Sequence, residues 1–259
     1  GDLSAYTAHY SIDALGPSVN NPGGYVTVGQ SNVPGTGLPG LHVVRWNTNG
    51  TIVAERLFSI AGSPNESIIG TSVDADANCD MLVAGRIRAG STFSNFVIRL
   101  NSALMPIGAG VRLNGPVEQD VDVQADWLAD GSVIVYDRLS LGAGVIETRI
   151  TRRTSSLGPV WSNRYHSFHV GAGSQFMARD IEQDPVSGNI FVCGTMNWPF
   201  LAGNRTLPML MSVGLAGGGV LQVRAYDVTA IAPWTSGGLD AIKFNPSAGA
   251  RLNDIIVAG

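Results

Sequence analysis

Lysine is nearly absent from this chain, in which Lys243 is the single lysine among 16 basic residues. Charged residues together make up 14% of the sequence, whereas about 25% is usual for globular domains. The formal net charge is −4, and a nucleic-acid surface needs clustered cations to neutralise phosphates. The composition therefore predicts that nucleic acid is not a partner of this protein.

Long apolar runs are also missing. No stretch approaches the roughly 18 consecutive apolar residues of a membrane-spanning helix, so we expect no transmembrane segment. No signal peptide is visible and the chain begins at Gly1, which indicates processing or trimming. The two cysteines, Cys79 and Cys193, fall in a predicted turn and a predicted strand of different repeats. We therefore expect no disulfide between them.

Catalytic signatures are the third absence. The sequence contains no G-x-S-x-G or H-E-x-x-H motif and no cysteine–histidine signature of the kind that activates a nucleophile. Acidic residues recur in one predicted strand of the repeats, where they could form a general acid–base pair or bond to the ends of the strands. The second interpretation explains their regular placement. These residues are Asp74, Asp122, Asp180 and Glu182.

What the chain has in abundance is a repeated pattern of short strands. An apolar run that ends on Gly or Asp recurs five times: "YVTVG", "MLVAG", "VIVYD", "IFVCG" and "IIVAG", ending at positions 29, 85, 137, 194 and 259. A short segment that ends on Asp or Asn precedes four of these runs, and two further strand-like segments follow most of them. Four short strands in a repeat of about 40–50 residues are typical of a propeller blade. The sequence therefore predicts an all-β propeller of four-stranded antiparallel blades.

These repeats resemble the blades of secreted bacterial β-propeller proteins, which read "DGGYIVAG", then a strand, then "GxxxWxxxYG". The matching pieces here are "GGYVTVG" (23–29), "RWNTNG" (45–50), "ADGSVIVYD" (129–137) and "SSLGPVWSNRYH" (155–166). The resemblance extends over nearly the whole chain. It implies a bacterial, secreted protein that is extracellular or attached to the cell surface.

The ends of the chain predict how the propeller is organised. "AYTAHYSI" (5–12) matches the fourth strands "WSNRYHSF" and "LQVRAYDV", so we predict that residues 1–12 form an outer strand that completes a fifth blade. The result is a five-bladed ring, or a fragment of a ring of six to eight blades whose remainder comes from a longer chain, another copy or a supplied strand. The predicted units of this single domain, residues 1–259, are 13–60, 61–114, 115–168, 169–228 and the partial unit 229–259.

One turn carries a possible metal site. In "DADANCD", oxygen-bearing side chains alternate at Asp74, Asp76, Asn78 and Asp80. Calcium prefers six to eight oxygen ligands, which loops of alternating carboxylates supply. The alternative is an Asx turn, because Asp76 occupies the position where the other repeats also have Asp or Asn. Calcium is the only cofactor that the sequence suggests.

Ligand binding is expected on the loops at one face of the propeller. The connections between second and third strands, and those between a fourth strand and the next blade, share this face, and loops on rigid scaffolds often carry function. Aromatic and arginine side chains are enriched in binding hot spots. The predicted ligand-binding residues on these loops are Arg86, Arg88, Phe93, Arg138, Trp198, Phe200 and Trp234.

These features predict a non-enzymatic extracellular or cell-surface module that binds a protein or glycan, or that builds surface structure. The alternative is an enzyme of the hydrolase or lyase kind with its site on the loop face. Converging carboxylates or a histidine on that face would favour the enzyme. Aromatic or flat polar surfaces would favour binding.

Overall fold

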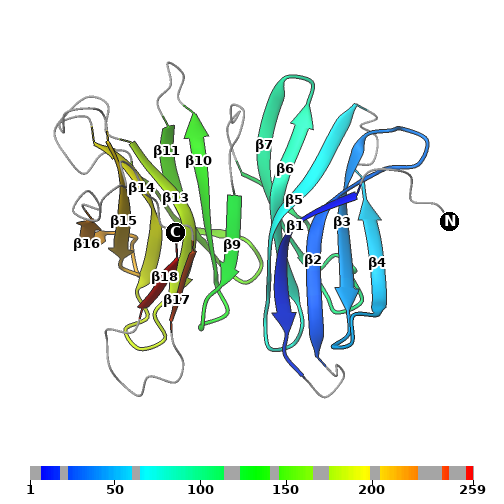
Figure 1. Ribbon diagram of the computed structural model, residues 1–259, viewed down its shortest axis with the longest axis horizontal. Coiled ribbons are helices and arrows are strands. Elements are labelled where there is room, and N and C mark those ends of the chain that lie inside the picture. The colour runs from blue at the N-terminus through cyan, green and yellow to red at the C-terminus, as the bar shows by residue number, and fades with distance from the viewer. Residues whose placement is uncertain are drawn as a thin grey trace. The chain divides into compact units, whose positions relative to one another are not determined.

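The computed structural model describes nine segments of the chain (Figure 1). These are residues 7–17, 23–59, 65–113, 123–140, 146–165, 175–198, 205–226, 241–244 and 255–258. They consist of strands and turns, with no helix among them. None of these segments therefore contains a helix long and apolar enough to cross a membrane. The chain divides into two compact units, Gly1–Trp127 and Leu128–Gly259.

The first unit contains two four-stranded antiparallel sheets, each with its strands side by side in chain order (Figure 1). The strands of the first sheet are β1 (Thr7–Leu15), β2 (Gly24–Asn32), β3 (Pro39–Trp46) and β4 (Ile52–Phe58). Those of the second are β5 (Glu66–Ala75), β6 (Met81–Ala89), β7 (Thr92–Leu100) and β8 (Val111–Arg112), and the unit ends with β9 (Val123–Trp127).

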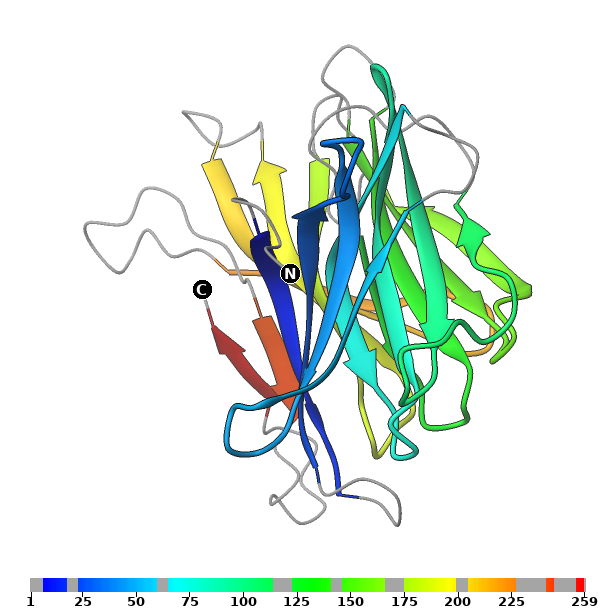
Figure 2. The same cartoon turned by 90° about the vertical axis from the view of Figure 1, so that its right-hand side faces the viewer.

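β9 and the strands that follow it form two more four-stranded antiparallel sheets and a hairpin. The third sheet has the order β12-β11-β10-β9, with β10 (Val133–Ser140), β11 (Ile146–Arg153) and β12 (Pro159–Tyr165). The fourth contains β13 (Gln175–Gln183), β14 (Ile190–Trp198), β15 (Arg205–Val213) and β16 (Val220–Ala225). The hairpin of β17 (Ala241–Phe244) and β18 (Ile255–Ala258) is drawn in orange-red and red in Figure 2.

The prediction of four-stranded antiparallel units is thus confirmed for all four sheets, and their repetition is compatible with a propeller-like arrangement. None of the described sheets closes on itself into a ring.

The recurring apolar runs are the second strands of these sheets, and in β6 the run is buried on both faces, whereas in β2 Tyr25 is exposed. In β6, Met81, Leu82, Val83 and Ala84 have no exposed surface. Alternating residues of this run, Met81 and Val83, belong to the core of the first unit together with Val28 of the first sheet. Because both faces of such a strand are covered, apolar residues occupy consecutive positions instead of alternating with polar ones.

The fourth strands are far more exposed. The sequence of β16 is exposed at every position except Val223, which is half-buried, and β4 has no fully buried residue. Burial in these sheets therefore decreases from the second strand to the fourth, although β4 and β16 keep exposed apolar residues such as Ile52 and Leu221.

A β-bulge explains the glycine that closes most of the apolar runs. In three sheets the first strand carries an extra residue opposite the second strand, between His9 and Ser11, Gly70 and Ser72, and Ala178 and Asp180. The residues opposite these bulges are Gly29, Gly85 and Gly194. A Cβ atom on these glycines would lie 1.8, 2.0 and 2.1 Å from a carbonyl oxygen of the first strand. Only glycine allows this close approach of two backbones.

The same bulge corrects the prediction for the N-terminal strand. Residues 7–12 are not an outer strand, because β1 is the first strand of the first sheet and pairs with β2. Its register matches that of β5, with Ser11 and Asp13 at the positions of Ser72 and Asp74. The aromatic residues that residues 5–12 share with the fourth strands therefore led to the wrong position for this strand. The bulge and the polar residues that follow it determine the place of this strand, so it does not complete a fifth sheet.

Those polar residues join the first strands of neighbouring sheets. In the first unit, backbone N–H groups donate to side-chain oxygens of the preceding first strand. The pairs are Val73 N to Ser11 Oγ (3.3 Å), Ala75 N to Asp13 Oδ2 (2.9 Å), Ala125 N to Ser72 Oγ (3.4 Å) and Trp127 N to Asp74 Oδ2 (2.6 Å). In the second unit Ile242 N donates to Asp180 Oδ2 at 2.8 Å. Asp74 and Asp180 are therefore backbone acceptors, as the bonding interpretation of the recurring acids expects.

Candidate functional site

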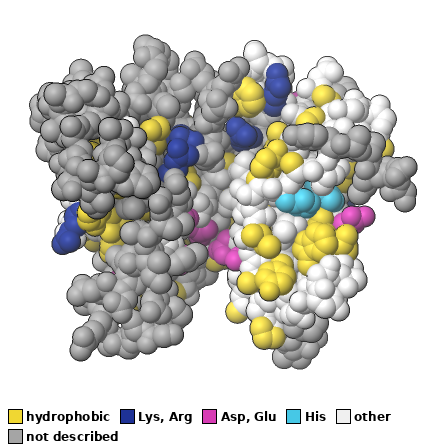
Figure 3. Space-filling view, viewed as in Figure 1, with side chains coloured by type: hydrophobic (Ala, Val, Ile, Leu, Met, Phe, Trp, Pro, Cys, Tyr) yellow, Lys and Arg dark blue, Asp and Glu magenta, His cyan; other side chains and the backbone are white. Residues whose placement is uncertain are grey.

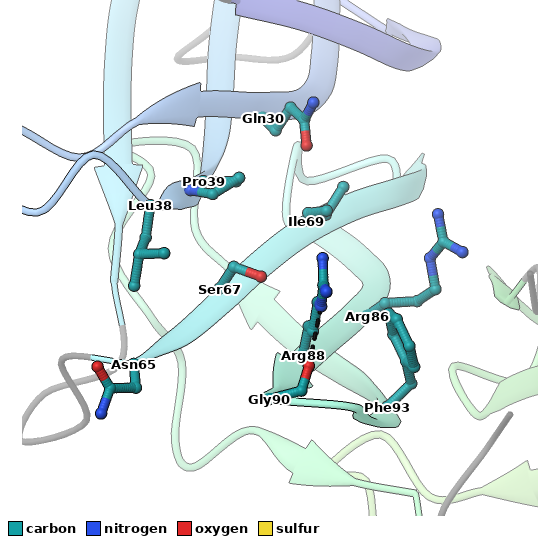
Figure 4. A pocket seen from close by; sticks show the side chains of 10 residues that line it. All are labelled: Gln30, Leu38, Pro39, Asn65, Ser67, Ile69, Arg86, Arg88, Gly90 and Phe93. Atoms are coloured by element: carbon teal, nitrogen blue, oxygen red, sulfur yellow. Dashed lines mark hydrogen bonds between the residues drawn. The ribbon is translucent and has the colours of Figure 1, made fainter. Parts of the chain in front are cut away.

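A cavity of about 610 Å³ lies at the loop end of the first unit (Figure 4). We call it the Arg86–Arg88 cavity. It surrounds the start of β5 and receives residues from three connections that the sequence places on the ligand-binding face, 30–40, 60–68 and 86–95. Its lining residues are Gln30, Leu38, Pro39, Asn65, Ser67, Ile69, Arg86, Arg88, Gly90 and Phe93. Three of the seven predicted ligand-binding residues, Arg86, Arg88 and Phe93, are among them.

Strand register places these residues on one face of the second sheet. Ser67 of β5 lies opposite Arg88 of β6, which lies opposite Phe93 of β7. In the adjacent row, Ile69 lies opposite Arg86. Directly opposed residues in antiparallel strands project to the same side of a sheet. The two arginines, two positions apart on β6, therefore project to the same side as Ser67 and Phe93.

Arg88 is exposed but held in place by its neighbours. Its Nε donates to the carbonyl oxygen of Gly90 at 3.0 Å, the dashed line in Figure 4. Its guanidinium carbon lies 5.6 Å from the centre of the Phe93 ring, a cation–π distance. The bond to Gly90 uses only Nε. The two terminal nitrogens of the guanidinium can therefore donate hydrogen bonds to a ligand.

Arg86 differs because no described residue neutralises it. It makes no hydrogen bond or ion pair within the described segments, and its Nε is buried. Other arginines of the second sheet are paired, Arg99 with Asp80 at 3.3 Å and Arg112 with Glu66 at 2.9 Å. A buried donor without an acceptor costs about 1–3 kcal/mol, and an oxygen atom of a ligand would remove this cost.

Uncharged polar groups complete the lining. Gln30 is 8% exposed and Ser67 is 6% exposed, and neither side chain forms a hydrogen bond within the described part of the chain. Figure 4 shows Ser67 and Arg88 in the middle of the view, with Gln30 above them and Asn65 at the lower left. Among the described residues that line the cavity there is no Asp, Glu, His or Cys. The cavity therefore offers donors and cations to a ligand, on a chain whose net charge is −4.

The other four predicted ligand-binding residues are not among the described residues of the first unit. Arg138 is buried on β10, in the second unit, and directly follows Asp137 as Arg86 follows Gly85 in the repeat. Trp198 ends β14, where its backbone pairs with Arg205. Phe200 and Trp234 lie outside the described residues. The sequence missed Gln30 and Ser67 as lining residues, because neither is aromatic or charged.

The proposed calcium turn forms an Asx turn in the structure. Asp76 Oδ1 accepts hydrogen bonds from the backbone N–H groups of Asn78 and Asp80, both at 2.9 Å. Asp74 is bonded to Trp127, and Asp80 is paired with Arg99. Burial and the nearby charge of Asp76 raise the pKa of Asp80 above its usual value, although Arg99 opposes the shift. Within the described residues, no group of three His, Cys, Asp or Glu side chains is placed to hold a metal.

A histidine pair on the first sheet was not anticipated from the sequence. The rings of His9 and His42 have their centres 5.3 Å apart, and Figure 3 shows the two histidines next to hydrophobic and acidic side chains. His42 is buried, and its Nε2 lies 3.8 Å from Glu55 Oε2, too far for a hydrogen bond. Burial lowers the pKa of His42, against the opposing effect of Glu55, and burial together with His42 lowers the pKa of His9.

No protein-family model matches this chain, and no curated protein matches it.

Proposed function

We propose that this chain is a non-enzymatic β-propeller module, extracellular or on a bacterial cell surface, that binds a protein or glycan ligand in the Arg86–Arg88 cavity. Its four sheets and the β17–β18 hairpin would be blades of the propeller. The observation that carries the proposal is the gathering of Arg86, Arg88 and Phe93 in one cavity. Arginine and aromatic side chains supply most of the binding energy in protein recognition sites.

The composition of the lining favours binding over the alternative of a hydrolase or lyase. Such an enzyme needs a general acid and base, or a nucleophile beside a base. The lining residues are instead cationic, amide, hydroxyl and apolar. Ser67 has no histidine or carboxylate beside it in this lining. Groups of this kind orient a ligand through hydrogen bonds without exchanging protons with it.

The test is a binding screen with the intact protein against a glycan panel and a peptide panel. Ligands retained by the wild type should bind at least about tenfold more weakly to Phe93→Ala and to Arg88→Gln, a loss of about 1.4 kcal/mol or more. Arg164→Gln is the matched control, because this arginine is 58% exposed on β12, in the second unit. Ligands that bind all three variants equally well, or two panels without any retained ligand, would refute the proposal.

A further inference from the structure

We propose that the Arg86–Arg88 cavity binds an acidic sugar through its carboxylate group. This inference rests on the proposed binding function and specifies the ligand of the same site. The first argument is charge. Two guanidinium groups project to one side of β6, and none of the described lining residues carries a carboxylate. The positive charge is local, because the chain as a whole carries a formal charge of −4.

The second argument is the geometry of the available donors. A guanidinium presents its N–H groups as a planar fork that matches the two oxygens of a carboxylate. Arg86 has all of its donors unused within the described residues and is only partly exposed. We therefore assign the carboxylate to Arg86. Positions two apart on a strand are separated by roughly 7 Å, so Arg88 lies within reach of the hydroxyl groups of the same or the next sugar.

The third argument is the remainder of the lining, which matches a sugar better than an inorganic anion. The hydroxyl of Ser67 and the amides of Gln30 and Asn65 supply both donors and acceptors. Sugar hydroxyl groups need both. Ile69 and Phe93 offer apolar surface to the C–H groups of a sugar ring. The volume of about 610 Å³ lies within the range of small-ligand sites, about 300–1,000 Å³.

Two ligands that differ only in charge provide the test. We would titrate the intact protein calorimetrically with trigalacturonic acid and with its methyl ester, which keeps the sugar rings but removes the negative charges. The acid should bind, and the ester should bind at least about tenfold more weakly. Arg86→Gln should weaken binding of the acid at least tenfold and leave binding of the ester nearly unchanged. Arg164→Gln should alter neither affinity.

Further variants keep the inference testable if Arg86→Gln does not fold. Arg88→Gln alters an exposed side chain and should also weaken binding of the acid. Arg86→Lys preserves the charge but loses the planar fork, so its affinity should lie between those of the wild type and Arg86→Gln.

Several results would overturn the inference. These are equal affinities for acid and ester, no binding of the acid, unchanged affinity in both glutamine variants, or tighter binding of a sulfated trisaccharide than of the uronic acid. The inference can also fail while the proposed binding function holds. If Phe93→Ala abolishes binding of a neutral glycan or a peptide while Arg86→Gln does not, the cavity is a binding site but its ligand is not acidic.

Discussion

Both units join neighbouring sheets through side chains that accept from backbone N–H groups, but the second unit adds a cluster of side-chain donors on its strand β12. In the first unit, side chains of β1 and β5 accept from backbone N–H groups, as Asp74 does from Trp127. In the second unit, side chains of β12 donate to backbone carbonyl groups of the turn between β15 and β16. Trp161 Nε1 donates to Leu215 O at 2.9 Å and Asn163 Nδ2 donates to Gly217 O at 2.9 Å.

This difference shows that the sheet architecture does not depend on one kind of link. The glycine-rich stretch "GLAGGG" (214–219) forms the hairpin turn between β15 and β16, and it also supplies the carbonyl acceptors. A Cβ atom on Gly218 would lie 2.6 Å from both Asn163 and Trp161, so the donors of β12 approach closely only because this residue is glycine. The acceptors on β1 and β5 are serine and aspartate side chains. The second unit combines a link of this kind, at Asp180, with the donors of β12.

The largest effect is expected from Asp74→Ala. Trp127 N–H would lose a charged acceptor at 2.6 Å, and bonds of this kind contribute about 1.5–3 kcal/mol. We expect the free energy of unfolding of the first unit to fall by about 2 kcal/mol, and amide exchange at Trp127 to accelerate. Asp74→Asn keeps an acceptor and should lose less. A change below about 0.5 kcal/mol in Asp74→Ala would show that charged acceptors do not stabilise the first unit.

A smaller effect is expected from Tyr165→Phe in the second unit. The Tyr165 hydroxyl is buried and donates to Gly218 O, and burial raises the pKa of Tyr165, so the hydroxyl stays protonated at neutral pH. An uncharged bond of this kind contributes about 1 kcal/mol, which is the loss we expect from chemical denaturation of this variant. A loss larger than that of Asp74→Ala would reverse the ranking of the two kinds of link.

The two units should also respond to acid in different pH ranges. In the first unit, the lowered pKa values of His9 and His42 mean that the unfolded chain binds protons more readily than the folded chain. Stability is then complete above about pH 6.5 and declines as the pH falls below that value. In the second unit, hydrogen bonds from Ser132 lower the pKa of Asp130, and this contribution is lost only as the pH falls below about 4.

Amide exchange in each unit between pH 7 and pH 5 measures this difference. Protection should decrease in the first unit and stay nearly constant in the second. His42→Gln, which cannot titrate, should flatten the response of the first unit. An equal decrease in wild type and variant would mean that His42 is not the group responsible.

The smallest expected effect is that of metal removal. Because Asp74, Asp76 and Asp80 have separate partners, EDTA should change the melting temperature by less than about 1 °C, as no bound ion would stabilise the folded state. A clear decrease that millimolar calcium reverses would instead support the calcium hypothesis for Asp74, Asp76, Asn78 and Asp80.

The sequence alone determined the features that depend on neighbours within a few residues. The apolar run at 81–85 predicted the strand β6, and the position of Asp76 in the repeat indicated the Asx turn that forms with residues two and four positions on. The glycines that end the apolar runs were visible in the repeat. Their reason, the backbone of a bulged strand within about 2 Å of a would-be Cβ, needed the structure.

Tertiary structure decided what depends on residues far apart in the chain. The place of β1 follows from its pairing with β2 and from links such as that of Asp13 to Ala75, 62 residues away, whereas the local aromatic pattern indicated another position. The Arg86–Arg88 cavity combines Gln30 of the first sheet with residues of the second. The periodicity of a strand shows which of its faces is apolar. Which residues cover that face depends on how separate sheets pack, and patterns over a few residues do not encode this packing.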